Sequence, residues 1–570
     1  MASLSRKTVR GHPYYYAREC QRINGKPRIV WQKYLGRVED IVAAVEQHRR
    51  GAAAVAAAPA ETQLSELGAA AALYDLSVQL DLAGCIDRQV PKRGRGPSVG
   101  TYLLAAVLNR CLAPRSKAQL GPWFATTVLR RLLPVEARQL TSQRFWDHMD
   151  RVSAAAITAI ETELVQRAVT TFQLDLGRLL FDATNYFTYI DTFNAAATLA
   201  QRGHSKEGRA ALRLVGLALL VTTDGHVPLG HLTYPGNQAD ATTFSRFTET
   251  LLGRLQQLTE QVEHVTLVFD KGNNSQANLT ALSDTGLHFV GALVPSQHPD
   301  LLAVPRAQLA PLPGLPGVST WRCTQTICGQ PRTVLVVFND RLFLAQCQTL
   351  LRQIAQRQRG LEALAARLDR WRQGPHRGRG PSLAATLKAV DNLLRGRHLR
   401  ELLAVTVTTP DGLPQLSWRF QTDAWERLQH TWLGRSLLFT DNHAWTDQQI
   451  VQTYHAQYGI EQAFRTLKDP HHIALRPQYH WTDQKVRVHV FICVLALLLL
   501  SLLRRQAVAL GFPLSLPRLL ELLSGIRELI SVFPPARRHQ QPQLRTCLAA
   551  MAPDQRALFD AFDLGRYTAR

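Results

Sequence analysis

The chain has 570 residues, 46% of them hydrophobic, so it has ample material for a large buried core. Its 66 Lys and Arg residues against 44 Asp and Glu residues give a net charge of +22, which favours a polyanionic partner, with nucleic acid first and a membrane surface second. The most apolar stretch, Val490–Leu503, has 14 residues, whereas a membrane-spanning helix needs about 20. We therefore expect a buried core helix and no membrane partner.

The N-terminus has no apolar segment of the kind that directs secretion, which predicts a cytoplasmic protein. The eight cysteines are scattered, and the closest pair, Cys323 and Cys328, has no second pair to complete a zinc ribbon. Reduced structural thiols are the expectation, in keeping with that compartment.

Residues 1–50 are expected to form a small β unit. Two β-rich runs in Tyr14–Leu35 flank Asn24-Gly25, a dipeptide that supplies the positive φ of a tight hairpin turn. The Ala-rich residues 51–60 have no polar face to pack, so they are interpreted as a linker or a frayed helix.

Residues 61–170 have the apolar spacing of helices and are predicted to be a helical, DNA-binding domain. Within them, Leu140–Met149 has the pattern of a recognition helix, because Ser142, Gln143 and Arg144 would open it with side chains that reach base edges. An ordinary capped helix explains the same pattern.

Between residues 171 and 295 the apolar period changes to that of strands, with turn signals such as Thr223-Asp224-Gly225 between them. The expected strands are Arg178–Phe187, Leu214–Thr222, His226–Tyr234 and His264–Asp270, with a helix between the last two and a further helix and strand across Leu279–Val294. This order predicts an α/β fold with a mixed sheet in three layers.

Residues 296–445 change character again and are predicted to be an insertion domain. They contain a hairpin-like pair around Cys323 and Val334–Phe338, and a long amphipathic run from Leu342 to Trp371. Residues 446–505 would complete the core, and residues 506–570 would form a largely helical C-terminal region.

Two acids follow buried strands of the expected core. Asp182 comes directly after the apolar run Arg178–Phe181, and Asp270 ends the run His264–Asp270. Aspartates also end strands as turn or cap residues, and each acid taken alone fits that role equally well. Weaker candidates, which lie in turns or at helix starts, are Asp175, Asp191, Asp224 and Asp240.

A third acid lies on a predicted helix that begins with a capping box at Thr446 and ends near Lys468. Tyr454, Glu461 and Lys468 are spaced by seven residues, about two turns, so they would share one helix face. A solvated pair between Glu461 and Arg465 is the alternative. Three carboxylates meeting at one sheet edge could hold two divalent cations about 4 Å apart, as metal-dependent phosphodiester chemistry requires.

The pattern resembles the DDE-class transposases of bacterial insertion sequences, in the branch whose glutamate lies in the signature Tyr-x2-Arg-x3-Glu-x6-Lys. Here the signature positions are Tyr454, Gln457, Glu461 and Lys468, so Gln457 replaces the arginine, and Arg465 could partly substitute for it. Further similar segments span nearly the whole chain in the expected order: NGKPRIVWQKYLGRVEDI, FDATNYF at Asp182, GHSKEGR, YPGNQAD, FDKGNNS at Asp270 and ALRPQYHWTDQKVRVHVFICVLALLL.

The resemblance implies an RNase H-like core with an insertion before the glutamate helix. It implies that Asp182, Asp270 and Glu461 are catalytic and bind two Mg²⁺ or Mn²⁺ ions. DNA contacts would come from Tyr454, Gln457, Arg465 and Lys468. The partners would be double-stranded DNA, as the element's terminal inverted repeats and as target, bound by a homodimer in the bacterial cytoplasm at the nucleoid. Cleavage would leave a 3′-hydroxyl that attacks the target.

Two other hypotheses remain open. Gln457 motivates a DNA-binding transposase remnant that has lost catalysis, and the same triad suits a metal-dependent nuclease without strand transfer. The glycine-rich loops near Gly94 and Gly378 lack a Walker pattern, so no ATP site is expected. His471 and His472 are interpreted as part of a surface loop and not as metal ligands.

Overall fold

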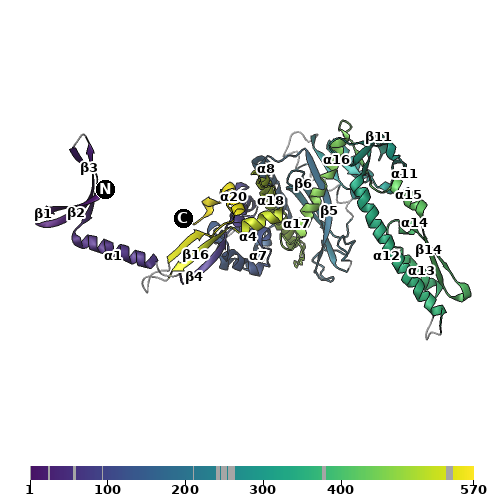
Figure 1. The fold of residues 1–570 in the computed structure, drawn as a ribbon, viewed down its shortest axis with the longest axis horizontal. Helices are drawn as coiled ribbons and strands as arrows, with labels where there is room; N and C mark the ends of the chain where they lie inside the picture. The colour runs from purple at the N-terminus through teal and green to yellow at the C-terminus, as the bar shows by residue number, and fades with distance from the viewer. Residues whose placement is uncertain are drawn as a thin grey trace. The chain divides into compact units, whose positions relative to one another are not determined.

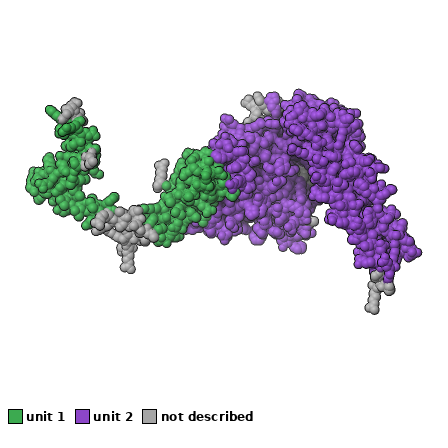
Figure 2. All heavy atoms as spheres, in the orientation of Figure 1, with its two compact units in different colours: residues 1–71, 126–128, 520–570 green, residues 72–125, 129–519 purple. Residues whose placement is uncertain are grey.

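The computed structural model describes residues 2–23, 26–55, 59–92, 94–209, 211–238, 244, 253, 264–374, 380–533 and 543–569. They form two compact units, shown in different colours in Figure 2. The first contains Met1–Ala71, Thr126–Val128 and Leu520–Arg570, and the second contains Ala72–Ala125 and Leu129–Leu519.

The first unit begins with a three-stranded antiparallel sheet of β1 (Ala2–Val9), β2 (His12–Ile23) and β3 (Lys26–Gly36). β2 and β3 are the two strands that the sequence predicts, although their turn at Asn24-Gly25 lies outside the described residues. The helix α1 (Val38–Val55) follows and extends into the Ala-rich segment.

A second three-stranded sheet of the first unit was not predicted from the sequence. It pairs β4 (Glu61–Glu66) with β16 (Arg527–Phe533), and β16 with β17 (Gln543–Leu548). The helix α20 (Pro553–Ala561) follows. The C-terminal region is therefore less helical than expected, because two of its segments pair with a strand from the other end of the chain.

Helices between β4 and β5 agree with the predicted helical segment. They are α2 (Gly68–Gln79), α3 (Leu82–Gln89), α4 (Val99–Leu112), α5 (Leu120–Ala125), α6 (Leu129–Leu132), α7 (Ser142–Met149) and α8 (Ala154–Phe172). The hydroxyl of Thr141 caps α7 by accepting from the backbone N–H of Arg144, so this helix begins at Ser142 as predicted.

A nine-stranded mixed sheet is the centre of the second unit, in the order β10-β11-β12-β15-β9-β8-β5-β6-β7. The predicted core strands are confirmed as β5 (Arg178–Thr188), β6 (Arg213–Thr222), β7 (Pro228–Pro235), β8 (Thr266–Phe269) and β9 (His288–Ala292), with α10 (Gln276–Thr285) before β9. β5 pairs antiparallel with β6 and parallel with β8, which pairs parallel with β9. The helix predicted between β7 and β8 lies almost entirely outside the described residues.

The predicted insertion, residues 296–445, differs from the structure at both ends. β10 (Ala310–Pro311), β11 (Val318–Ile327), β12 (Gln330–Asn339) and β15 (Arg435–Thr440) are strands of the main sheet, because β15 pairs with both β9 and β12. Between β12 and β15 a separate hydrophobic cluster forms from α12 (Asp340–Arg372), α13 (Leu383–Leu393), α14 (Leu399–Leu402), β13 (Leu403–Thr408), β14 (Gln415–Phe420) and α15 (Thr422–Thr431).

Helices α16 (Asp447–His455), α17 (Tyr458–Lys468) and α18 (Asp483–Ala509) complete the sheet unit, and α19 (Leu516–Ser524) follows. α17 packs against β5, and α18 packs against α4 (Figure 1). α18 also packs against β7, and α16 packs against β8 and β9. By length and composition α18 is apolar enough to cross a membrane, but 94% of its most apolar window is buried inside the fold. It has the burial of a core helix, as predicted for Val490–Leu503.

Candidate active site

Two of the predicted acids lie at neighbouring positions of adjacent strands. Asp182 is in β5, and Asp270 directly follows β8. The strands pair in parallel with Leu180 opposite Val268, and each acid comes two residues later. Because alternate residues of a strand point to one face, both carboxylates project from the same edge and the same face. Both side chains are half-buried.

The phenol of Tyr454, on α16, lies close to all three predicted acids. Its hydroxyl donates a hydrogen bond to Asp270. Burial raises the pKa of Tyr454, and the negative charges of Asp270, Glu461 and Asp182 raise it further. Three acids from separate elements therefore act electrostatically on one side chain.

A cavity of about 270 Å³ brings these groups together. The residues that line it are Asp182, Asp270, Tyr454, His455, Gln457, Tyr458 and Glu461. Five of the seven are predicted site residues. His455 and Tyr458 were missed, and the only sequence signal for them is that they flank Gln457.

The single helix predicted from Thr446 to Lys468 is wrong, because the structure has α16 and α17 in its place. Between them, the backbone N–H groups of Gln457 and Gly459 donate to carbonyls three residues earlier, which tightens the chain into a turn. Gly459 lies against His226, where an added Cβ would come within 2.1 Å of the imidazole. The seven-residue spacing therefore places Glu461 and Lys468 on one face of α17. It does not extend that face to Tyr454, which lies on α16.

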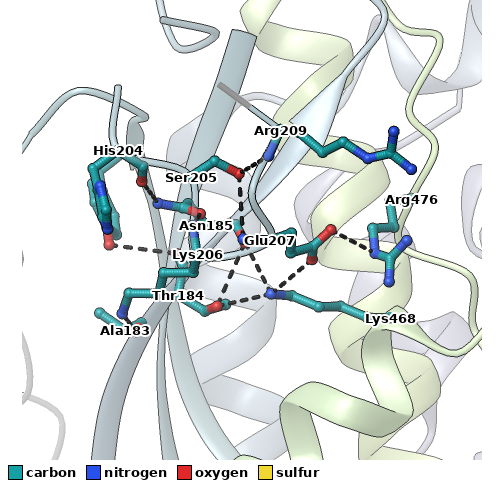
Figure 3. A network of polar contacts seen from close by, with 11 residues as sticks. Ala183, Thr184, Asn185, His204, Ser205, Lys206, Glu207, Arg209, Lys468 and Arg476 are labelled. Carbon is teal, nitrogen blue, oxygen red and sulfur yellow. Dashed lines mark hydrogen bonds and ion pairs between the residues drawn. The ribbon is translucent and has the colours of Figure 1, made fainter. Parts of the chain in front are cut away.

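Lys468 does not line the carboxylate cavity. Its ammonium group donates to the hydroxyl of Thr184 at 2.8 Å and to the carbonyl of Asn185 at 2.9 Å, and it pairs with Glu207 at 3.2 Å (Figure 3). Burial lowers the pKa of Lys468, and the charge of Glu207 opposes that effect. Since Thr184 follows Asp182 by two residues, Lys468 lies beside the same face of β5.

Glu207 also pairs with a second cation, the guanidinium of Arg476, at 3.2 Å (Figure 3). The loop that carries Glu207 is bound to β5, because Lys206 donates from its side chain to the carbonyl of Ala183 and from its backbone to the amide oxygen of Asn185. This loop, the GHSKEGR segment of the sequence, therefore joins β5 to the end of α17.

Arg465 lies in a different cavity, of about 250 Å³, together with His226 and Arg504. Its guanidinium carbon is 6.0 Å from the centre of the Tyr458 ring. Gln457 occupies the N-cap position of α17 and lines the carboxylate cavity. Arg465 and Gln457 thus face separate cavities.

The donor chemistry of the carboxylate cavity fits Mg²⁺ or Mn²⁺. Within the described ranges, no three His, Cys, Asp or Glu side chains form a group compact enough to hold a metal ion. Magnesium takes few protein carboxylates and keeps several waters, so three acids that line one cavity without converging on a single point suit it. Three like charges also repel one another, and a cation between them would relieve that repulsion. The ligands would be Asp182, Asp270 and Glu461.

The fold and the cavity define an α/β protein with an acidic site where the middle of β5 and the end of β8 meet the helices α16 and α17. Residues 182–499, more than half of the chain, match the family described as "Transposase DDE domain", and the match begins at Asp182 and includes Asp270 and Glu461. The chain belongs to this transposase family.

Among solved structures, the chain is similar to the piggyBac transposase synaptic complex with hairpin DNA at a TM-score of 0.35 and 9% identity, covering 80% of this chain and 78% of that one. It is similar to the Mos1 transposase paired-end complex with left transposon end at a TM-score of 0.15 and 12% identity, covering 35% of this chain and 60% of that one. Comparison with curated sequences gives no match.

Proposed function

We propose that this chain is a DNA transposase in which Asp182, Asp270 and Glu461 bind two Mg²⁺ or Mn²⁺ ions, cut the ends of an insertion sequence and join the 3′-hydroxyl to target DNA. The observation that carries the proposal is that Asp182, Asp270 and Glu461, from three separate elements, line one cavity of about 270 Å³. The family match, which covers all three acids, supports it.

The strand order supports an RNase H-like core. Three antiparallel strands, β7, β6 and β5, are continued by β8 and β9 parallel to β5. The helical insertion between β12 and β15 precedes the helix that carries Glu461. These features agree with the architecture that the resemblance implies.

The side chains of the site have separate tasks in this proposal. When bound, the cations would activate a water and stabilise the charge that develops on phosphate oxygens. The hydroxyl of Tyr454 donates to Asp270 and so orients that carboxylate. A phenol is protonated at neutral pH, and the raised pKa of Tyr454 keeps its hydroxyl a hydrogen-bond donor at higher pH as well.

DNA is the proposed partner because the chain carries a net charge of +22. The proposed DNA contacts are Tyr454 and Gln457, which line the carboxylate cavity, and Arg465 and Lys468, which lie outside it. The helix α7 is a proposed recognition helix. Cutting two element ends together requires at least a homodimer on DNA. The proposed location is the bacterial cytoplasm, at the nucleoid, with no membrane and no ATP involved.

The test is metal-dependent cleavage of duplex DNA made from the sequences that flank the gene. Each of Asp182→Asn, Asp270→Asn and Glu461→Gln should reduce cleavage at least about 100-fold. Loss of a residue that only supports a metal ligand already reduces activity by up to about 100-fold, and loss of the ligand itself should reduce it no less. Duplex binding without metal should stay unchanged. Asp369→Asn, which removes a half-exposed carboxylate from α12, is the matched control and should cleave normally.

Full cleavage by one of the three variants would remove that residue from the site. The formation of joined product DNA would distinguish a transposase from a nuclease without strand transfer. DNA binding without cleavage in the presence of any divalent metal would favour a transposase remnant that has lost catalysis.

A further inference from the structure

The sheet of β1, β2 and β3 is a strongly basic element outside the carboxylate site. Residues 1–37 contain nine Lys and Arg residues and one acid, Glu19. The cations are Arg6, Lys7, Arg10, Arg18, Arg22, Lys26, Arg28, Lys33 and Arg37. So many like charges on a small sheet repel one another and attract a polyanion.

The strand register places three tyrosines and two cations on one face of this sheet. Tyr16 is opposite Ser5 of β1 and Tyr34 of β3, Tyr14 is opposite Lys7, and Arg18 follows Tyr16 by two residues. Residues that pair, and residues two apart on a strand, share a face. The tyrosine face is therefore made of Lys7, Tyr14, Tyr16, Arg18 and Tyr34.

Contacts between these side chains hold them in place. The ring centres of Tyr16 and Tyr34 are 5.2 Å apart, and those of Tyr14 and Tyr34 are 6.1 Å apart. The guanidinium of Arg18 lies 5.5 Å from the centre of the Tyr16 ring, and that of Arg37 lies 5.6 Å from the Tyr14 ring. Stacked arginines lose less conformational freedom when they bind phosphate.

Both faces of the sheet carry exposed side chains in the described part of the first unit, and Tyr14, Tyr16 and Arg18 of the tyrosine face are half-buried. On the tyrosine face Tyr34 is 54% exposed, and on the other face Leu4 is 64% and Trp31 is 47% exposed. Arg6 and Lys33 also belong to that opposite face. Each pairs with a residue of β2 that lies between two residues of the tyrosine face.

Part of the sheet fits the major groove of duplex DNA. Neighbouring strands are about 4.8 Å apart, so two of the three strands can enter a groove about 12 Å wide in the manner of a two-stranded β-ribbon. Arg10 and Gly11 have positive φ angles of 49° and 82° and form the two-residue turn between β1 and β2, which places Arg10 at the tip. The major groove of an RNA duplex is too narrow for such a sheet.

We propose that β1, β2 and β3 form a DNA-binding surface, with the tyrosine face against the major groove of duplex DNA and its cations, Lys7 and Arg18, on the phosphates. The proposal extends the proposed function by adding a second place of contact, remote in sequence from the carboxylates. The sheet proposal rests on the proposed function only for the choice of the DNA sequence, because the binding experiment does not require cleavage.

The test uses the full-length chain, a labelled duplex of about 30 base pairs from the DNA flanking the gene, and buffer with EDTA. Lys7→Ala/Arg18→Ala removes two cations from the tyrosine face, and Arg6→Ala/Lys33→Ala is the matched control from the opposite face. The first should weaken binding at least about tenfold and lower the slope of log Kd against log salt by about 2, as loss of two phosphate contacts predicts. The control should change the affinity less than about threefold.

Unchanged binding by Lys7→Ala/Arg18→Ala, or equal losses by both double variants, would overturn the proposal. Equal affinity of the wild-type chain for an RNA duplex of the same sequence would also overturn it. A chain that binds the duplex through this face but fails to cleave it with Mg²⁺ contradicts the proposed function alone. Normal cleavage combined with unchanged binding by Lys7→Ala/Arg18→Ala contradicts the sheet proposal alone.

Discussion

Glu207 is the acid between two cations, Lys468 and Arg476, where β5 meets the end of α17. The side chains of Glu207 and Lys468 are 19% and 15% exposed, so water screens the pair only weakly. Removing one member of a poorly solvated ion pair leaves the other charge uncompensated. Glu207 is therefore one of the groups that position Lys468, and its charge opposes the effect of burial on the pKa of that lysine.

Glu207→Gln should move the protonation of Lys468 to lower pH. The charge of Glu207 raises the pKa of Lys468 against the effect of burial, so its loss lowers that pKa further. The alkaline limb of the pH profile for cleavage should shift to lower pH, and the free energy of unfolding should fall by about 1–3 kcal/mol. Superimposed profiles of variant and wild type would show that Glu207 has only a structural role, and Asp369→Asn should shift neither quantity.

At the residue scale the sequence predicts the three acids that line the carboxylate cavity, but not the contacts that support them. Asp182 and Asp270 follow short apolar runs, and Glu461 lies in a spaced motif, so local pattern identifies all three. The ion pair between Glu207 and Lys468 joins residues far apart in the chain, and no periodicity in GHSKEGR indicates which helix its loop will meet. Tertiary contacts of this kind are absent from a single sequence.

The elements that could be predicted are those with a buried apolar pattern. β6 is buried at every residue, and its run of Leu, Val and Ala marks it as a central strand. β4, with the polar sequence ETQLSE, has no such pattern and becomes a strand only by pairing with β16, far along the chain. The break between α16 and α17 was missed for a similar reason, since Gly459 meets His226 only in the folded chain.

The helix α18 gives a prediction at the element scale. Leu499 is fully buried, so Leu499→Ala should lower the free energy of unfolding by about 2–5 kcal/mol, through lost apolar burial and the cavity left behind. Leu510, at the C-cap of the same helix, is 41% exposed and supplies the matched control. Leu510→Ala should cost less than about 1 kcal/mol in denaturant unfolding. Equal tolerance of both changes would contradict a packed core around α18.

At the scale of the whole molecule, the burial of His480 predicts how the free energy of unfolding depends on pH. His480 accepts from the ammonium group of Lys117 at 2.9 Å, and burial, followed by the charges of Lys117, Arg110 and Lys485, lowers the pKa of His480 to about 3. The unfolded chain therefore takes up a proton below pH 6.5 that the folded chain does not. Stability should fall as the pH drops from 6.5 towards 3, by up to about 1.4 kcal/mol per pH unit.

Urea unfolding at pH 7 and pH 5 measures this effect. The wild-type chain should lose about 2 kcal/mol between the two values from His480 alone. His480→Gln keeps an acceptor for Lys117 and should reduce the loss by that amount, whereas the exposed His264→Gln should keep the wild-type dependence. A His480→Gln chain as acid-sensitive as the wild type would contradict the assignment.

The structure also changes where the insertion is placed in the whole molecule. Composition predicts its limits at residues 296 and 445, but pairing of β15 with β9 and β12 assigns four of those strands to the main sheet. Which strand lies beside which depends on contacts between distant segments, and composition contains no information about them. The sequence shows that an insertion exists, and the fold shows where it leaves the sheet.

The two ends of that insertion are neighbours: the backbone N–H of Asn339, at the end of β12, donates to the carbonyl of Gly434, just before β15, at 2.9 Å. The segment from α12 to α15 leaves the main sheet and returns to it at this one point, and it has its own hydrophobic cluster. A segment with adjacent ends is exchangeable in the way that domain insertions are. The chain is in this respect modular: a short turn could join Asn339 to Gly434 while β12 and β15 stay paired.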